Sequence, residues 1–205
     1  MKVLIGTPIH ETKDYCMEKW LENVSQLEYS ADLLLVDNST STDYIEKVKG
    51  YCAKYGITKY KIKHLEIPER QSTDRDIDEV IHERVCRSRE LIRQHVLYRN
   101  YDAWFSWECD QIIPTDGLRK LVQLIEAEDL LLVDHNCWVN NIPNLVSFDF
   151  GVSLFKRKCL EKYSFLPESG SWYEAESWFR KRLLKDGCNY LEVQGIIEPI
   201  YHLDK

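Results

Sequence analysis

The chain has 205 residues, of which 44% are hydrophobic and 12% aromatic, and its formal net charge is -7. This length and composition predict a single folded domain and exclude a disordered chain. The negative charge argues against extensive sequence-independent binding to nucleic acid, which requires Lys and Arg to neutralise phosphates. No apolar run approaches the roughly 20 residues that span a bilayer and the apolar start is too short for a signal peptide, so we expect a cytoplasmic protein without a transmembrane segment.

The first half of the chain alternates short apolar runs with segments of helical periodicity. The strands expected there cover residues 2–6, 32–36, 59–67 and 104–107. One helix is expected to begin at Asp14, and two others to cover 44–54 and 77–98. The strand over 32–36 is apolar without interruption, which is typical of a strand covered on both faces. A charged stretch over 68–76 lacks apolar anchors and is expected to be a loop.

The second half is less regular. Its expected elements are helices over 117–127 and 172–185 and strands over 130–133, 189–193 and 196–202. Gly187 ends the later helix in the left-handed conformation that glycine accepts. Because strands and helices alternate, we expect an α/β fold: one domain with a mostly parallel central sheet, flanked by helices on both faces and joined by right-handed crossovers.

The sequence indicates neither a site built from cysteines nor a nucleotide site built on a Gly-rich loop. Seven cysteines are scattered along the chain without a Cys-x-x-Cys pair, which predicts reduced thiols rather than a disulfide framework or a zinc site. No Gly-rich phosphate loop follows the first strand, which argues against a Rossmann dinucleotide site and a Walker-type nucleotide site.

Acidic residues gather where an apolar strand ends. The run from Ala103 to Trp107 leads into Glu108-Cys109-Asp110, and residues two apart on a strand point to the same side. Two carboxylates suit Mg²⁺ or Mn²⁺, which keep positions for substrate phosphates, although such a triplet is also typical of the polar end of a strand. Ligands of parallel sheets bind beyond the carboxyl ends of strands, so we expect Thr7-Pro8 and Asp37-Asn38-Ser39 around the same crevice as the acidic triplet.

These motifs resemble those of GT-A fold glycosyltransferases, most of all the inverting family 2 enzymes. The run from Leu35 to Ser39 is similar to their Val-Asp-Asp/Asn-Ser loop, and Glu108-Cys109-Asp110 to their Asp-x-Asp, with glutamate in place of the first aspartate. The resemblance implies that Asp37 binds the nucleotide base, with Thr7 and Pro8 beside the base or ribose. It further implies that Glu108 approaches the ribose or a metal-bound water, and that Asp110 ligates the metal.

The resemblance continues into the later part of the chain. Residues 148–155 are similar to the family's acceptor-side segment, and 175–187 match its Glu-Asp helix in the spacing of acid, apolar, Arg-Leu and Gly positions. Glu176 then falls at the position of the catalytic base, with Glu174 as the alternative. Without this pattern, Glu176 is an ordinary exposed acid on a helix.

Two further residue types have a counterpart in the family. Tyr201-His202 resembles a late strand that supplies a metal-binding histidine, although a histidine so close to the end is by itself often incidental. An arginine of the helix over 77–98 is implied to face the donor diphosphate, and the spacing leaves Arg89 or Arg87 as candidates rather than all of its arginines. The alternative for these arginines is a solvated helix face.

The implied activity is metal-dependent transfer of one sugar, with inversion, from a nucleoside-diphosphate sugar, with a UDP-sugar favoured, to a hydroxyl group. Residues 1–113 would bind the nucleotide-sugar and 114–205 the acceptor, with Mn²⁺ or Mg²⁺ as the metal. The family's processive members carry a Gln-x-x-Arg-Trp motif, which is absent here and argues for single transfer. Four aromatic residues would either stack on sugars or fill the core: Trp138, Phe150, Trp172 and Tyr173.

The acceptor and the partners are left open by the sequence. A glycan, a lipid-linked sugar, a protein and a small molecule all fit, while the acidic balance disfavours a modified nucleic acid; a homodimer is also compatible with the sequence. One alternative function is a nucleotidyltransferase, although the Gly-rich, Lys-containing loop of those enzymes is missing after the first strand. The other is a non-catalytic module that binds nucleotide-sugars.

Overall fold

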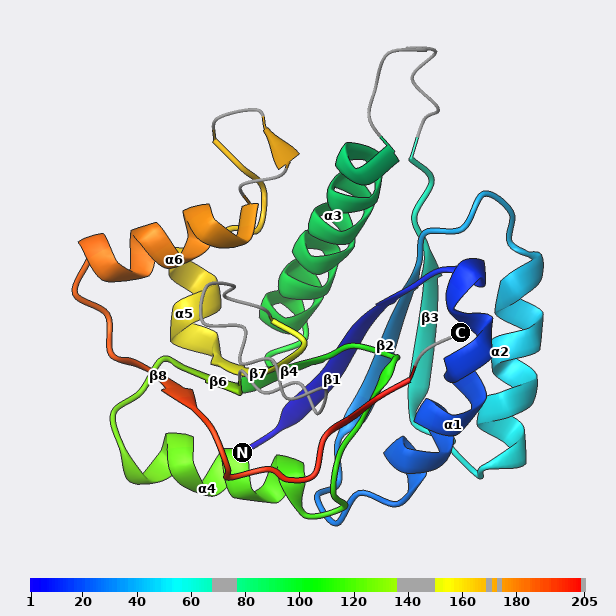
Figure 1. Cartoon of the computed structure of the whole chain (residues 1–205), viewed down its shortest axis with the longest axis horizontal. Coiled ribbons are helices and arrows are strands. Elements are labelled where there is room, and N and C mark those ends of the chain that lie inside the picture. Colours follow the sequence, from blue (N-terminus) through cyan, green and yellow to red (C-terminus); the bar gives the residue numbers. More distant parts are fainter. Residues whose placement is uncertain (68–76, 136–149, 169–170, 173–174, 204–205) are drawn as a thin grey trace.

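A seven-stranded sheet forms the centre of the molecule (Figure 1). A computed structural model describes residues 1–67, 77–135, 150–168, 171–172 and 175–203. The strands are β1 (Val3–Ile9), β2 (Asp32–Asp37), β3 (Tyr60–His64), β4 (Ala103–Trp107), β6 (Leu132–His135), β7 (Val152–Lys156) and β8 (Tyr190–Val193). Their order is β3-β2-β1-β4-β7-β6-β8, and only β7 runs antiparallel to its two neighbours. The expected mostly parallel sheet is confirmed.

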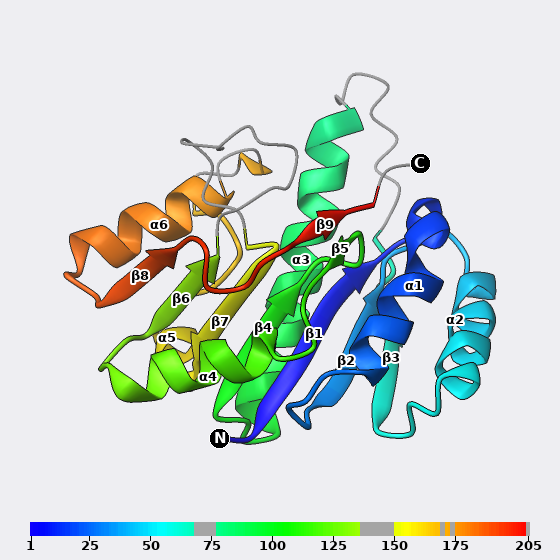
Figure 2. The ribbon, with the colours of Figure 1, turned by 60° about the horizontal axis from the view of Figure 1, so that its bottom comes forward.

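Helices cover both faces of this sheet, as expected (Figures 1 and 2). One face carries α1 (Asp14–Ser25), α2 (Asp43–Lys54) and α4 (Gly117–Ala127), and the other carries α3 (Ile77–Tyr98), α5 (Arg157–Lys162) and α6 (Ala175–Lys185). Successive side chains of β1 alternate between the two cores, since Val3 and Ile5 pack on the first side and Leu4 on the second. Within the described residues, none of the helices combines the length and the apolar character needed to cross a bilayer.

Several elements differ from the sequence expectation. β1 continues through Thr7-Pro8 to Ile9 instead of ending at Gly6, and α6 begins at Ala175. The expected strand over 196–202 is mostly a loop whose Ile197 and Ile200 are buried in the core, and only β9 (Tyr201–His202) pairs, with β5 (Gln111–Ile112). Its apolar residues therefore serve packing rather than strand pairing. The loop expected over 68–76 lies outside the described residues.

Gly6 is a point of close approach between β1, β4 and α3. A methyl group at Gly6 would overlap the side chain of Ile92 and lie 2.6 Å from Nε1 of Trp104, which donates a hydrogen bond to the Gly6 carbonyl at 2.9 Å. We therefore expect Gly6→Ala to lower the free energy of unfolding by about 1–3 kcal/mol, as overpacking does. Urea denaturation would measure it. Gly50→Ala is the matched control, because its added methyl group in α2 would meet nothing within 4 Å beyond its chain neighbours and the backbone of its own helix, and equal losses in both variants would contradict the packing argument.

Candidate functional site

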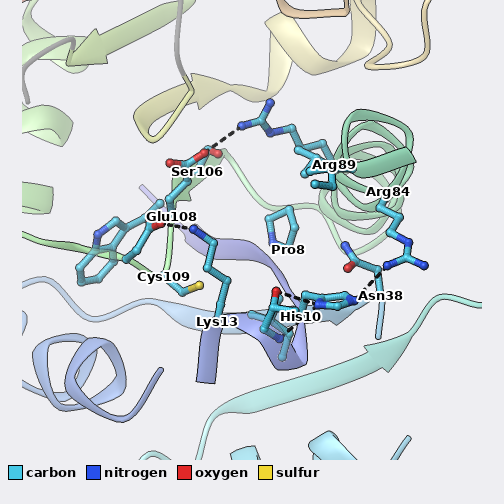
Figure 3. Close-up of a pocket in the computed structure, with 15 residues that line it drawn as sticks. Pro8, His10, Lys13, Asn38, Arg84, Arg89, Ser106, Glu108 and Cys109 are labelled. Atoms are coloured by element: carbon cyan, nitrogen blue, oxygen red, sulfur yellow. Dashed lines mark hydrogen bonds and ion pairs between the residues drawn. The ribbon is translucent and has the colours of Figure 1, made fainter. Parts of the chain in front are cut away.

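A pocket of about 490 Å³ opens at the carboxyl ends of β1 and β4 (Figure 3). Its lining comes from four parts of the chain: the segment after β1, the loop after β2, one side of α3, and the acidic residues after β4. Pro8, Glu108 and Asp110, which the sequence analysis names as candidate site residues, belong to this lining. The position follows the rule that parallel sheets bind ligands beyond the carboxyl ends of their strands.

Asp110 is the most enclosed acid of the pocket, with 5% of its side chain exposed. Its Oδ2 is hydrogen-bonded and ion-paired with Nζ of Lys13, and Nε2 of His202 lies 3.5 Å from the same oxygen. Burial lowers the pKa of Lys13, but the hydrogen bond and the charge of Asp110 outweigh it, so that the pKa lies above its ordinary value. Lys13 is therefore a fully charged ammonium at neutral pH.

The small sheet of β5 and β9 explains how His202 reaches Asp110. β5 and β9 lie side by side (Figure 2). Gln111 pairs with His202 in this sheet, and the amide of Leu203 donates to the carbonyl of Asp110 at 2.7 Å. Backbone pairing therefore fixes the end of the chain beside the acidic loop. The predicted pair Asp110 and His202 is brought together by this sheet.

Glu108 points to Arg89 of α3, whereas Asp110 pairs with Lys13. Its Oε1 lies 3.6 Å from a terminal nitrogen of Arg89, and Gln111 donates to its Oε2 at 3.2 Å. Arg89 is 3% exposed and lines the pocket, whereas Arg87 pairs with Glu83 at 2.8 Å outside this lining. Of the two arginines that the sequence left open, Arg89 is the one at the pocket.

Nothing in the sequence marked His10 and Lys13 as pocket residues. The helix spacing favoured Arg87 and Arg89 over Arg84, which also lines the pocket. Arg84 of α3 donates a hydrogen bond to Nε2 of His10 at 3.0 Å, and Nδ1 of His10 contacts the hydroxyl of Thr12 at 2.9 Å. Burial and the nearby Arg84 lower the pKa of His10. The imidazole is therefore neutral at pH 7, and the positive charge of the pocket comes from Lys13, Arg84 and Arg89 (Figure 3).

Asp37 and Thr7 are fully buried and hold the strand ends together. Asp37 accepts hydrogen bonds from Ser39 through Oδ1, at 2.6 Å to the hydroxyl, and pairs with Nδ1 of His64 through Oδ2 at 2.8 Å. The hydroxyl of Thr7 donates to the carbonyl of Trp107 at 2.8 Å. Asn38, which follows Asp37, lines the pocket. Roles of Asp37 and Thr7 toward a nucleotide stay predictions.

Cys109 fixes the acidic loop to α1. Its thiol contacts that of Cys16, and this hydrogen bond together with burial raises the pKa of Cys109 well above its ordinary value. Cys109 is therefore an uncharged thiol in the core, and every cysteine in the described residues is a free thiol.

The predicted acceptor side is only partly described. Glu176 lies in the first turn of α6, but its side chain, like Glu174, Trp138 and Tyr173, lies outside the described residues. Phe150 is fully buried and packs edge-to-face on Phe155 at 5.2 Å, so it belongs to the core rather than to a sugar-stacking surface.

The described residues contain no group of three or more metal-ligating side chains. The carboxylate of Asp110 and the imidazole of His202 are nevertheless groups that can ligate Mn²⁺, and a diphosphate would add further oxygen ligands. These two protein ligands therefore fit a metal ion that is shared with a substrate, in contrast to a metal site built from protein ligands alone.

Solved structures of similar fold include glycosyltransferases. The chain matches S. aureus TarS (residues 1–349) with a TM-score of 0.68 and 14% identity, over 99% of this chain and 60% of that one. For the mannosyltransferase PcManGT of Pyrobaculum calidifontis, in complex with GDP-Man and Mn²⁺, the TM-score is 0.71 at 14% identity, over 99% and 56%. For glucosyl-3-phosphoglycerate synthase of Mycobacterium tuberculosis, with Mn²⁺, UDP-glucose and phosphoglyceric acid, it is 0.57 at 13% identity, over 100% and 72%.

Sequence comparison adds no relative, since no protein-family model and no curated protein match the chain. The chain spans about three fifths of the length of TarS 1–349 and of the mannosyltransferase. At these identities the likeness concerns the fold.

Proposed function

Because this chain has the GT-A fold of glycosyltransferases, we propose that it transfers one sugar from a nucleoside-diphosphate sugar to a hydroxyl acceptor. The observation that carries the proposal is the pocket at the strand ends, where the buried Asp110 faces the cations Lys13, Arg84 and Arg89. The similar structures solved in complex with GDP-Man and Mn²⁺ or with UDP-glucose and Mn²⁺ support a nucleotide-sugar as donor. A UDP-sugar is the donor class we favour.

The cations of the pocket suit a diphosphate. Guanidinium groups bind phosphate oxygens through paired hydrogen bonds, and an ammonium adds a compact point charge. In the free protein Glu108 pairs with Arg89 and positions it at the pocket. Pocket residues run from Pro8 to Asp110, which supports the assignment of donor binding to residues 1–113.

Asp110 and His202 would hold Mn²⁺ or Mg²⁺, which would stabilise negative charge on the departing diphosphate as a Lewis acid. Glu176 would take the proton from the acceptor hydroxyl as its oxygen attacks the anomeric carbon from the opposite face, which inverts the configuration. The acceptor class stays open, as do a cytoplasmic location and a homodimer.

Screening UDP- and GDP-sugars for metal-dependent release of the nucleoside diphosphate tests the proposal. A glycosyltransferase turns over a donor in the presence of Mn²⁺, whereas a binding module is stabilised against unfolding without turnover. A protein that neither binds nor turns over any nucleotide-sugar would contradict the proposal, and transfer of a nucleotidyl group would favour the nucleotidyltransferase alternative.

Arg89→Met is expected to weaken donor binding. A hydrogen bond to a charged group contributes about 1.5–3 kcal/mol, so we expect the Kd of the nucleoside diphosphate to rise about 10- to 100-fold. Isothermal titration calorimetry would measure it. Arg87→Met is the matched control, because Arg87 lies on the same helix but pairs with Glu83 and stacks over Trp172 at 5.0 Å, away from the pocket lining. Equal weakening in both variants would remove Arg89 from the donor site.

A further inference from the structure

Lys13 already occupies the carboxylate to which a metal ion would bind. It is the last residue of a short 3-10 turn, η1 (Glu11–Lys13), between β1 and α1, and its Nζ pairs with Oδ2 of Asp110. That oxygen is also the one 3.5 Å from Nε2 of His202. A divalent cation shared by Asp110 and His202 would therefore meet the ammonium at the same atom, where like charges repel.

The surroundings of Lys13 differ from those of an ordinary surface pair. Asp110 is 5% exposed and lines the pocket, whereas Lys54 pairs with Glu18 at 2.5 Å between two side chains that are 59% and 40% exposed. The side chain of Lys13 is itself 43% exposed and lines the pocket, so it has room to turn without disturbing the core (Figure 3).

We propose that Lys13 is the resident counterion of Asp110 in the ligand-free protein, and that it exchanges this carboxylate for the diphosphate of the donor when a divalent cation binds. The proposal rests on the function proposed above and assigns a donor-binding role to Lys13. Phosphate oxygens are strong acceptors for an ammonium, and the four-carbon stem of lysine lets the charge move within the pocket.

This exchange of partners by Lys13 couples the binding of the metal ion to the binding of the donor. A metal ion alone must displace Lys13 from Asp110, which weakens its binding, while a diphosphate gives the displaced ammonium a new partner. The two ligands therefore strengthen each other, and this coupling is reciprocal for their affinities. Removal of the ammonium should therefore strengthen binding of the metal ion alone and weaken binding of the diphosphate.

Titration calorimetry with MnCl₂ alone, with UDP or GDP alone, and with both together tests this proposal on the full chain. A partly exposed ion pair contributes up to about 1 kcal/mol, so Lys13→Met is expected to bind Mn²⁺ alone about three- to fivefold more tightly than the unmodified protein. The same variant should bind the nucleoside diphosphate more weakly, and the gain in Mn²⁺ affinity on adding nucleotide should shrink. Lys54→Met should match the unmodified protein in every titration.

Two further variants complete the test. Lys13→Arg keeps the positive charge and should retain weak Mn²⁺ binding, and Asp110→Asn should lose Mn²⁺ binding, which locates the ion at this carboxylate. Equal Mn²⁺ affinities in Lys13→Met and the unmodified protein, or unchanged Mn²⁺ binding in Asp110→Asn, would overturn the inference while nucleotide binding still stood. Absence of nucleotide binding in the unmodified protein, with or without Mn²⁺, would instead overturn the proposed function.

Discussion

Glu176→Gln is expected to lower kcat for sugar transfer by about 10²- to 10⁴-fold, which is the usual contribution of a general base. Glutamine keeps the size of the side chain but cannot accept the proton of an acceptor hydroxyl. The fold should tolerate the change, because α6 is fixed by Phe179 and Leu183, which are fully buried, and Glu176 lies in the first turn of that helix. Initial rates with donor and acceptor, combined with calorimetry of nucleoside diphosphate binding, would separate lost chemistry from lost binding.

Controls decide whether the effect belongs to Glu176. Glu168→Gln changes an exposed acid that pairs with Arg182 at 2.9 Å and should keep kcat. Loss of turnover in Glu174→Gln instead of Glu176→Gln would move the base to the alternative acid. Unchanged kcat in Glu176→Gln, with donor binding intact, would remove it from the mechanism.

Most of the first half of the fold was predictable because β1, β2 and β4 are buried on both faces. Residues 33–36 of β2 are each 2% exposed or less, so this strand reads as an unbroken apolar run. The later strands carry weaker signals. β6 contains Asp134, which is fully buried beside Ser153, and a polar residue in a core strand breaks the apolar pattern from which strands are predicted.

One misplaced strand boundary explains why His10 and Lys13 were not predicted as pocket residues. The strand expected to end at Gly6 continues to Ile9, and Pro8 is tolerated within it although proline cannot donate to the ladder. The edge where ligands bind therefore lies three residues later, next to His10 and Lys13. The pairing of Lys13 with Asp110 also spans 97 residues, and no local periodicity encodes such a contact.

The positions of Asp110, Glu108 and Arg89 in the fold were easier to predict because each lies in or beside one long or fully buried element, although the choice of Arg89 or Arg87 also required the resemblance. The two acids follow β4, whose five residues are all buried, and Arg89 lies on α3, a helix of 22 residues. His202 required the resemblance, since the pairing of two-residue strands β5 and β9 leaves almost no pattern in the sequence.

Glu90 joins α3 to the segment after α5 in an enclosed hydrogen-bond network. Its side chain is 8% exposed and accepts from Nε of Arg93 at 2.9 Å, from the hydroxyl of Ser164 at 3.0 Å and from the amide of Phe165 at 3.0 Å. Burial acts to raise the pKa of Glu90, but the hydrogen bonds from Arg93 and Phe165 outweigh it and leave the pKa below its ordinary value. The ionised carboxylate is therefore the form that stabilises the fold.

Glu90→Ala is expected to lower the free energy of unfolding at pH 7 by about 3–5 kcal/mol, because it leaves Arg93 and the Phe165 amide without their buried acceptor. Since the folded-state pKa is lowered, the stabilisation is fully present above the ordinary value of 4.5 and is lost as the pH falls through the folded-state pKa. Urea denaturation at pH 7 and at acidic pH would measure both effects. Glu46→Ala, at an acid that is 75% exposed and pairs with Lys49 in α2, should cost under about 0.5 kcal/mol. A loss in Glu90→Ala as small as this control, or one that stays constant with pH, would mean that the network does not stabilise the fold through a charged carboxylate.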